Sequence, residues 1–179
     1  MAMEQKMNNS TGGDTPRKDR VFRDIHAKQW YDYGCTVNDY IAKFMFFWIA
    51  FNWLYNDPVF CSLREDSNTD RPSEKDLILN LVDASFEQLR QYNITKVGEF
   101  KTFEKQAIFN EKAGAPNYYA YRKLCSNNEQ TRIRGMFLTL YQVRCNLFHG
   151  SKVLKAPHEE EIISSAAVIL EGYLDKIIR

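Results

Sequence analysis

Two residues near the end of the chain have side chains suited to chemistry on a phosphate. They are Arg144 and His149, and Gly150 follows them directly. An arginine guanidinium is a permanent cation whose fork of N–H donors fits phosphate oxygens. A histidine can take or deliver a proton near neutral pH. Metal-free RNA cleavage, in which the 2′-hydroxyl is the nucleophile, needs both kinds of group, so this pair is consistent with phosphodiester chemistry.

The expected position of Arg144 strengthens this interpretation. We predict a helix over 128–148, and on a wheel of about 100° per residue Arg144 falls inside the apolar stripe, close to Phe137 and Leu140. A charge among apolar side chains is costly unless it is paired or serves a site. Two interpretations stay open. Arg144 is a functional cation, or it pairs with a core acid or reaches solvent at the helix end.

His149 does not share that face on a regular helix. Five residues rotate the chain by a net angle of about 140°, so Arg144 and His149 would point apart. Gly150 is a natural helix stop, which allows the last turn to loosen. The two side chains therefore meet through a loosened turn or through a second chain. The simpler interpretation of His149 is a side chain that caps the last carbonyls.

Other residues are candidates for supporting roles. Asn52 and Asn146 are possible orienting groups or phosphate donors, although Asn52 is equally well explained as a buried amide bonded to backbone. An aromatic and basic group comprises Tyr118, Tyr119, Tyr121, Arg122 and Lys123. Its tyrosines could stack on bases. We expect instead that they belong to the core or to an interface.

Charge is unevenly distributed along the chain. The net charge is only +1, but residues 120–155 carry a net of +6. The basic residues there are Arg122, Lys123, Arg132, Arg134, Arg144, Lys152 and Lys155, against Glu129 alone. Such a stretch can attract phosphates, although a solvated basic face balanced by acids elsewhere is the alternative.

The elements that must position these residues are helices. We predict a polar, disordered tail over 1–18 and a single all-helical domain over 19–179, formed by a bundle of about five helices. The expected helices span 20–33, 37–55 with Thr36 as N-cap, 74–89 with Ser73 as N-cap, 128–148, and 157 to the end, with a weaker helix over 99–112. Gly34 is expected to end the first helix, and we predict no strand.

Several kinds of protein are not indicated. The four cysteines, Cys35, Cys61, Cys125 and Cys145, form no Cys-x-x-Cys pair, so neither a zinc site nor a disulfide framework is expected. The longest apolar run, 44–54, is shorter than the roughly 20 residues that span a bilayer. A glycine-rich phosphate loop and a His-Glu-x-x-His motif are both missing. We therefore expect no metal, no cofactor and no membrane contact, in a cytoplasmic, reducing setting.

The segment Val143-Arg-Cys-Asn-Leu-Phe-His-Gly150, together with the apolar run 44–55, resembles the HEPN superfamily in its stand-alone and Apea-like forms. That resemblance implies a helical fold, a two-fold homodimer and a metal-independent endoribonuclease whose site combines both motifs. Arg144 and His149 would then be catalytic. The supporting residues would be Asn146, Asn52 and Cys145, with possible RNA contacts from Lys152, Arg122 and Lys123.

The sequence departs from the family pattern at two places. The family prefers a polar residue directly after the arginine, where this chain has Cys145. Ser151 stands where members regulated by a nucleotidyltransferase have a modified tyrosine. The resemblance implies a toxin or defence protein with an RNA substrate and an antitoxin partner. The alternatives are a non-catalytic HEPN module for dimerisation or RNA binding, and a helical bundle in which Arg144 holds a small anion.

Overall fold

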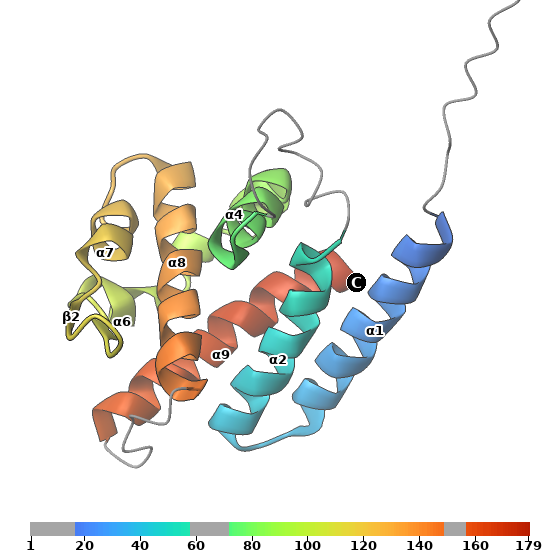
Figure 1. Cartoon of the computed structure of the whole chain (residues 1–179), viewed down its shortest axis with the longest axis horizontal. Helices are drawn as coiled ribbons and strands as arrows, with labels where there is room; N and C mark the ends of the chain where they lie inside the picture. The colour runs from blue at the N-terminus through green and yellow to red at the C-terminus, as the bar shows by residue number, and fades with distance from the viewer. Residues whose placement is uncertain (1–16, 58–71, 149–156) are drawn as a thin grey trace, which may run out of the picture.

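The computed structural model describes residues 17–57, 72–148 and 157–179, and it is mostly helical (Figure 1). The α-helices are α1 (Arg17–Thr36), α2 (Tyr40–Tyr55), α4 (Glu74–Ala84), α5 (Phe86–Gln91), α6 (Phe100–Glu104), α7 (Tyr118–Leu124), α8 (Glu129–Phe148) and α9 (Pro157–Ile178). A 3-10 helix, η1 (Ile94–Lys96), and two short strands, β1 (Phe109–Asn110) and β2 (Ala115–Pro116), complete the described elements. The helical class is confirmed. None of these helices is long and apolar enough to cross a membrane.

Helix α1 differs from the prediction at both ends. It begins at Arg17, inside the segment expected to be a tail, and it continues through Gly34 to Thr36. A Cβ at Gly34 would lie 2.7 Å from the ring of Phe47. Gly34 therefore allows α1 and α2 to approach closely rather than ending the helix.

Helix α2 is the central apolar helix, and it packs between α1 and α9 (Figure 1). Its N-cap is Asp39 rather than Thr36, because the Asp39 carboxylate accepts the Ala42 backbone N–H at 2.8 Å. It ends at Tyr55, as the sequence predicts. Its buried residues are Phe44, Phe47, Trp48, Ala50, Phe51, Leu54 and Tyr55.

The predicted helix over 74–89 is divided in two. Ser73 caps α4 in a full capping box with Asp76, as expected. The break at Ser85 was not predicted. Its hydroxyl donates to the Leu81 carbonyl at 2.7 Å and lies 3.1 Å from the Tyr173 hydroxyl on α9, so a long-range contact holds the kink between α4 and α5.

The prediction for 99–112 is wrong beyond its first turn. Helix α6 ends at Glu104, and the chain then forms an antiparallel pair in which Phe109 faces Pro116. The side-chain amide of Asn146 on α8 donates a hydrogen bond to the Phe109 carbonyl, and this tertiary contact overrides a weak local helical preference. These short elements explain why the described residues contain eight α-helices where about five were expected.

Helices α8 and α9 have nearly the predicted bounds. Asn128 caps α8 by accepting the Thr131 N–H at 2.9 Å, and acids fill the first turn of α9. A Cβ at Gly135 would lie 2.2 Å from the backbone nitrogen of Leu124, so this glycine lets α7 lie directly against α8. Helix α8 consequently has α7 on one side and α4 on the other (Figure 1).

Candidate functional site

Arg144 lies near the C-terminal end of α8 and is largely covered by aromatic rings. Its side chain is 26 % exposed. The guanidinium carbon lies 5.9 Å from the ring centre of Trp48 on α2 and 5.1 Å from that of Phe148. Both rings attract the cation. The predicted position in the apolar stripe is therefore explained by aromatic side chains that accept a charge.

The acidic partner of Arg144 is Glu74, the first residue of α4. Its carboxylate lies 3.5 Å from the Arg144 Nη1 atom and accepts the Tyr55 hydroxyl at 2.5 Å. The distance of 3.5 Å is at the outer limit of a hydrogen bond. The Arg144 Nε atom is buried and has no hydrogen-bond partner within the described part of the chain. Arg144 is thus paired with an acid, but only loosely.

Two tyrosines beside this pair stay neutral. Burial, and then the hydrogen bond to Glu74, raise the pKa of Tyr55 far above its usual value. Burial and a hydrogen bond with Cys145 likewise raise the pKa of Tyr141. Both phenols keep their protons at neutral pH, so neither is a base near Arg144. Cys145 is a half-buried free thiol next to Tyr141.

Asn52 lies in a hollow beside the same acid. The hollow has a volume of about 250 Å³ and is lined by Asn52, Tyr55, Asn56, Pro72, Glu74 and Leu77. The Asn52 side-chain oxygen accepts the Asn56 amide. Asn52 therefore shares a hollow with Glu74, and the structure gives it a hydrogen bond to Asn56 rather than to Arg144.

Asn146 lies on the other side of α8, where its hydrogen bonds stabilise the fold. Its amide donates to the Phe109 carbonyl at 2.5 Å and accepts from Gln142 at 2.8 Å. Gln142 in turn accepts from Asn117, the N-cap of α7, at 3.1 Å. Two residues rotate an α-helix by about 200°, so Asn146 and Arg144 point to nearly opposite sides. The structure does not bring these two predicted site residues together.

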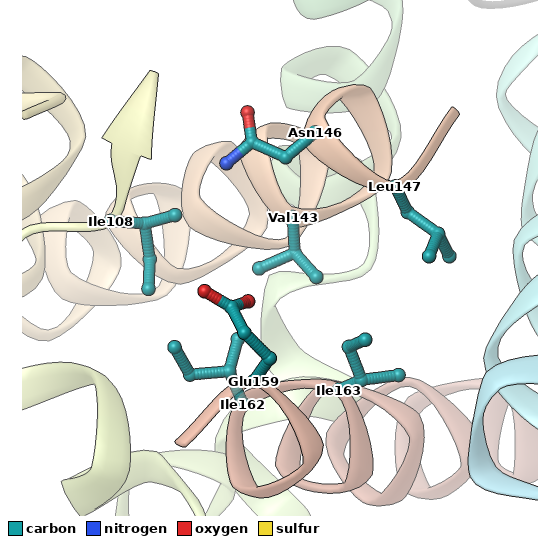
Figure 2. A pocket seen from close by; sticks show the side chains of 7 residues that line it. All are labelled: Ile108, Val143, Asn146, Leu147, Glu159, Ile162 and Ile163. Carbon is teal, nitrogen blue, oxygen red and sulfur yellow. The ribbon is translucent and has the colours of Figure 1, made fainter. Parts of the chain in front are cut away.

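The Asn146 side also contains a narrow cavity between α8 and α9 (Figure 2). It is lined by Ile108, Val143, Asn146, Leu147, Glu159, Ile162 and Ile163, and the Glu159 carboxylate points into it. Its volume of about 10 Å³ is far below the roughly 300 Å³ at which ordinary ligand pockets begin. This cavity is a gap in packing rather than a second binding site.

The basic stretch is not one continuous face. Arg132 pairs with Glu104, Arg134 lies 3.8 Å from Asp83, and Arg144 has Glu74. Arg122 and Lys123 have no acidic partner in the described ranges, and they lie on α7, away from the α4 side of α8 (Figure 1). His149, Ser151, Lys152 and Lys155 lie outside the described residues.

The two described histidines, His26 and His158, have contacts with residues other than Arg144. His26 stacks on Trp53, and His158 lies 2.8 Å from the Gln106 amide. No cluster of three or more His, Cys, Asp or Glu side chains suited to a metal ion occurs within 17–57, 72–148 and 157–179. The remaining histidine of the sequence, His149, directly follows Phe148, the last described residue of α8.

The structure adds site residues that the sequence analysis did not select. Glu74, Tyr55, Trp48, Tyr141 and Phe148 surround Arg144 from three helices. The predicted helix start at Ser73 places an acid, Glu74, directly after the cap. Nothing in the nearby sequence indicates that this acid contacts Arg144, which lies 70 positions later.

The resulting site is a loosely paired cation near two aromatic rings, at the junction of α2, α4 and α8. Such a cation can bind an anion that outcompetes one carboxylate. No protein-family model, curated protein or solved structure matches this chain.

Proposed function

We propose that the chain is a metal-independent endoribonuclease of the HEPN type, with Arg144 and His149 as its catalytic residues. The observation that carries the proposal is the state of Arg144. It is a permanent cation near two rings, 3.5 Å from its acidic partner, with a buried Nε that has no partner in the described ranges. Arg134 on the same helix has a similarly loose acid and a buried Nε, so what distinguishes Arg144 is its place beside the rings of Trp48 and Phe148 and its spacing from His149 in the sequence.

The proposed reaction needs no group beyond these side chains and the RNA. The 2′-oxygen bonds to phosphorus, and the bond from phosphorus to the 5′-oxygen breaks. One imidazole takes the proton of the 2′-hydroxyl, and another proton is delivered to the departing 5′-oxygen. Arg144 neutralises the charge that develops on the phosphate oxygens. The products are a 2′,3′-cyclic phosphate and a 5′-hydroxyl.

A homodimer would supply a neutral and a protonated His149 imidazole at the same time. In this proposal, His149 of one subunit acts as base while His149 of the partner subunit acts as acid. A second subunit would also allow Arg144 and His149 of different chains to meet, although a regular helix separates the two residues of one chain by about 140°. The exposed ring of Phe148 lies between these two residues in the sequence.

Glu74 would control access of the phosphate to Arg144. It lies 3.5 Å from the guanidinium and is fixed by the Tyr55 hydroxyl and by the start of α4. An RNA phosphate brings oxygens in the same fork geometry as a carboxylate, so it would displace Glu74 rather than bind beside it.

The test is cleavage of a mixed RNA in the presence of a chelator. We expect wild type to release cyclic-phosphate ends, and Arg144→Ala and His149→Ala to be at least about 100-fold slower. Arg134→Ala is the matched control, because Arg134 is also on α8, pairs with an α4 acid and has a buried Nε. It should cut normally. DNA of the same sequence, which lacks the 2′-hydroxyl, should stay intact. Equal cutting by all four proteins would overturn the proposal.

The second candidate is a non-catalytic RNA-binding or dimerisation module. The ion pair between Arg144 and Glu74 favours it, because the cation already has an acid nearby. So does Cys145, which is hydrogen-bonded to Tyr141 and stands where the family prefers a polar residue. This candidate predicts RNA binding without new RNA ends, whereas the first predicts both. A toxin or defence role, with an antitoxin partner, is proposed only with the first.

A further inference from the structure

Helix α7 and strand β1 carry exposed aromatic rings. The exposed fractions are 59 % for Tyr118, 60 % for Tyr119 and 41 % for Phe109. Tyr118 and Tyr119 are therefore not core residues, which leaves the interface half of the expectation for them. Tyr121 differs, since it is half-buried and its hydroxyl donates to the Glu104 carbonyl at 3.0 Å.

Hydrogen bonds tie these rings to the same stretch of α8. Phe109 pairs with Pro116 across the two strands, and the Phe109 carbonyl accepts the Asn146 amide. Pro116 precedes Asn117, which caps α7 and donates to Gln142. Strand β1 and the start of α7 are thus attached to α8 at Asn146 and Gln142, each two residues from Arg144 in the sequence.

The cations of α7 share its exposed face with the tyrosines. Arg122 follows Tyr118 by one helical turn, and Lys123 follows Tyr119 in the same way. The Lys123 Nζ atom lies 5.0 Å from the centre of the Tyr119 ring. Helix α7 contains no acid, and neither cation has an acidic partner among the described side chains. This face is complementary to a polyanion.

The opposite face of α7 is fixed. Ala120 and Leu124 are buried, and Gly135 allows the backbone of α7 to rest on α8. A rigid helix with exposed flat rings and uncompensated cations matches the requirements of a single strand, whose unpaired bases offer their faces for stacking. A duplex keeps its base faces inside, so it could use only the cations.

We propose that the α7 platform, defined as Tyr118, Tyr119, Arg122, Lys123 and Phe109, binds single-stranded RNA through base stacking and leads it to Arg144. The inference deepens the proposed function, and its final step rests on that function. Gln142 and Arg144 are separated by about 3 Å along the helix axis, and α8 is about 10 Å thick. A strand of a few nucleotides therefore reaches from one side to the other across the helix end, where Phe148 is exposed.

The test measures binding with cleavage removed. The full chain carrying His149→Ala is titrated with a labelled 12-nucleotide single-stranded RNA in chelator, by fluorescence anisotropy. Adding Tyr118→Ala and Tyr119→Ala should weaken binding by about fivefold or more for each ring lost. Adding Tyr33→Ala and Tyr40→Ala is the matched control, because these tyrosines are also exposed but lie on α1 and at the start of α2. The control should change affinity less than twofold.

Charge and stacking are separated by two further measurements. Adding Arg122→Ala and Lys123→Ala should reduce the slope of log affinity against log salt by about 1.4, from two lost phosphate contacts. Duplex RNA should bind more weakly than the single strand and be insensitive to loss of the tyrosines. The inference is overturned if the tyrosine pair matches its control, or if duplex and single strand lose affinity equally.

The outcomes also distinguish this inference from the proposed function. If the tyrosine variant loses single-strand binding but wild type cuts no RNA, the platform stands and the ribonuclease proposal fails. If wild type cuts RNA and the tyrosine variant both binds and cuts normally, the reverse holds. Binding of anionic lipid vesicles that depends on the tyrosines, with no RNA binding, would also overturn the inference.

Discussion

Arg144 and Asn146 are two residues apart on α8, and their surroundings differ completely. Asn146 is 1 % exposed, and both ends of its amide are bonded, to the Phe109 carbonyl and to Gln142. Arg144 is partly exposed, sits 3.5 Å from Glu74 and has a buried Nε without a partner within the described ranges. The amide of Asn146 is fully hydrogen-bonded within the fold. Of these two motif residues, only Arg144 has a donor without a partner in the described ranges.

The largest difference should appear in stability. Asn146→Ala would leave the Phe109 carbonyl and the Gln142 amide without a partner and open a space beside the narrow cavity, so we expect a loss of about 3 kcal/mol in the free energy of unfolding. Arg144→Met keeps an apolar chain beside the two rings and loses only a partly exposed ion pair, so it should cost about 1 kcal/mol or less. Urea denaturation measures both. Equal losses would remove the distinction between the two sides.

A smaller effect should come from the acid beside Arg144. Glu74→Gln keeps an acceptor for the Tyr55 hydroxyl but removes the charge that competes with phosphate. We expect RNA affinity to rise about threefold, in line with a partly exposed ion pair. Asp83→Asn, which removes the partner of Arg134, is the control and should leave affinity unchanged. A fall in affinity on Glu74→Gln would mean that Glu74 helps to bind RNA rather than competing with it.

The smallest effect at neutral pH concerns Tyr55. Burial and Glu74 raise its pKa in the folded chain, so the stabilising contribution of the neutral phenol is complete below the unfolded pKa of about 10 and is lost as pH rises beyond it. Tyr55→Phe should therefore lessen the decline of unfolding free energy above about pH 10 and barely alter its pH dependence near pH 7. A steep change in that dependence between pH 6 and 8 would contradict this account.

Local signals in the sequence predicted the parts of the fold that depend on neighbouring residues. The capping box at Ser73, the bounds of α8 and the acid-rich start of α9 are all such features. The position of Arg144 in an apolar stripe was also predictable, because it follows from the period of a helix.

The remainder depends on contacts between distant residues. Glu74 meets Arg144 across 70 positions, and Asn146 meets Phe109 across 37. The second contact turns a predicted helix into a strand pair and turns a predicted orienting residue into a structural one. The wrong prediction that Gly34 ends the first helix has a similar cause. A glycine is needed there because Phe47 on the next helix approaches closely.

The most direct test of the central claim compares Arg144→Met with wild type under conditions where both are folded. Single-turnover cleavage of RNA in chelator is followed by the appearance of 2′,3′-cyclic phosphate ends. We predict that the variant unfolds within about 1 kcal/mol of wild type and cuts at least about 100-fold more slowly. A variant that is equally stable and cuts at the wild-type rate would show that Arg144 is not the working residue on this side of α8.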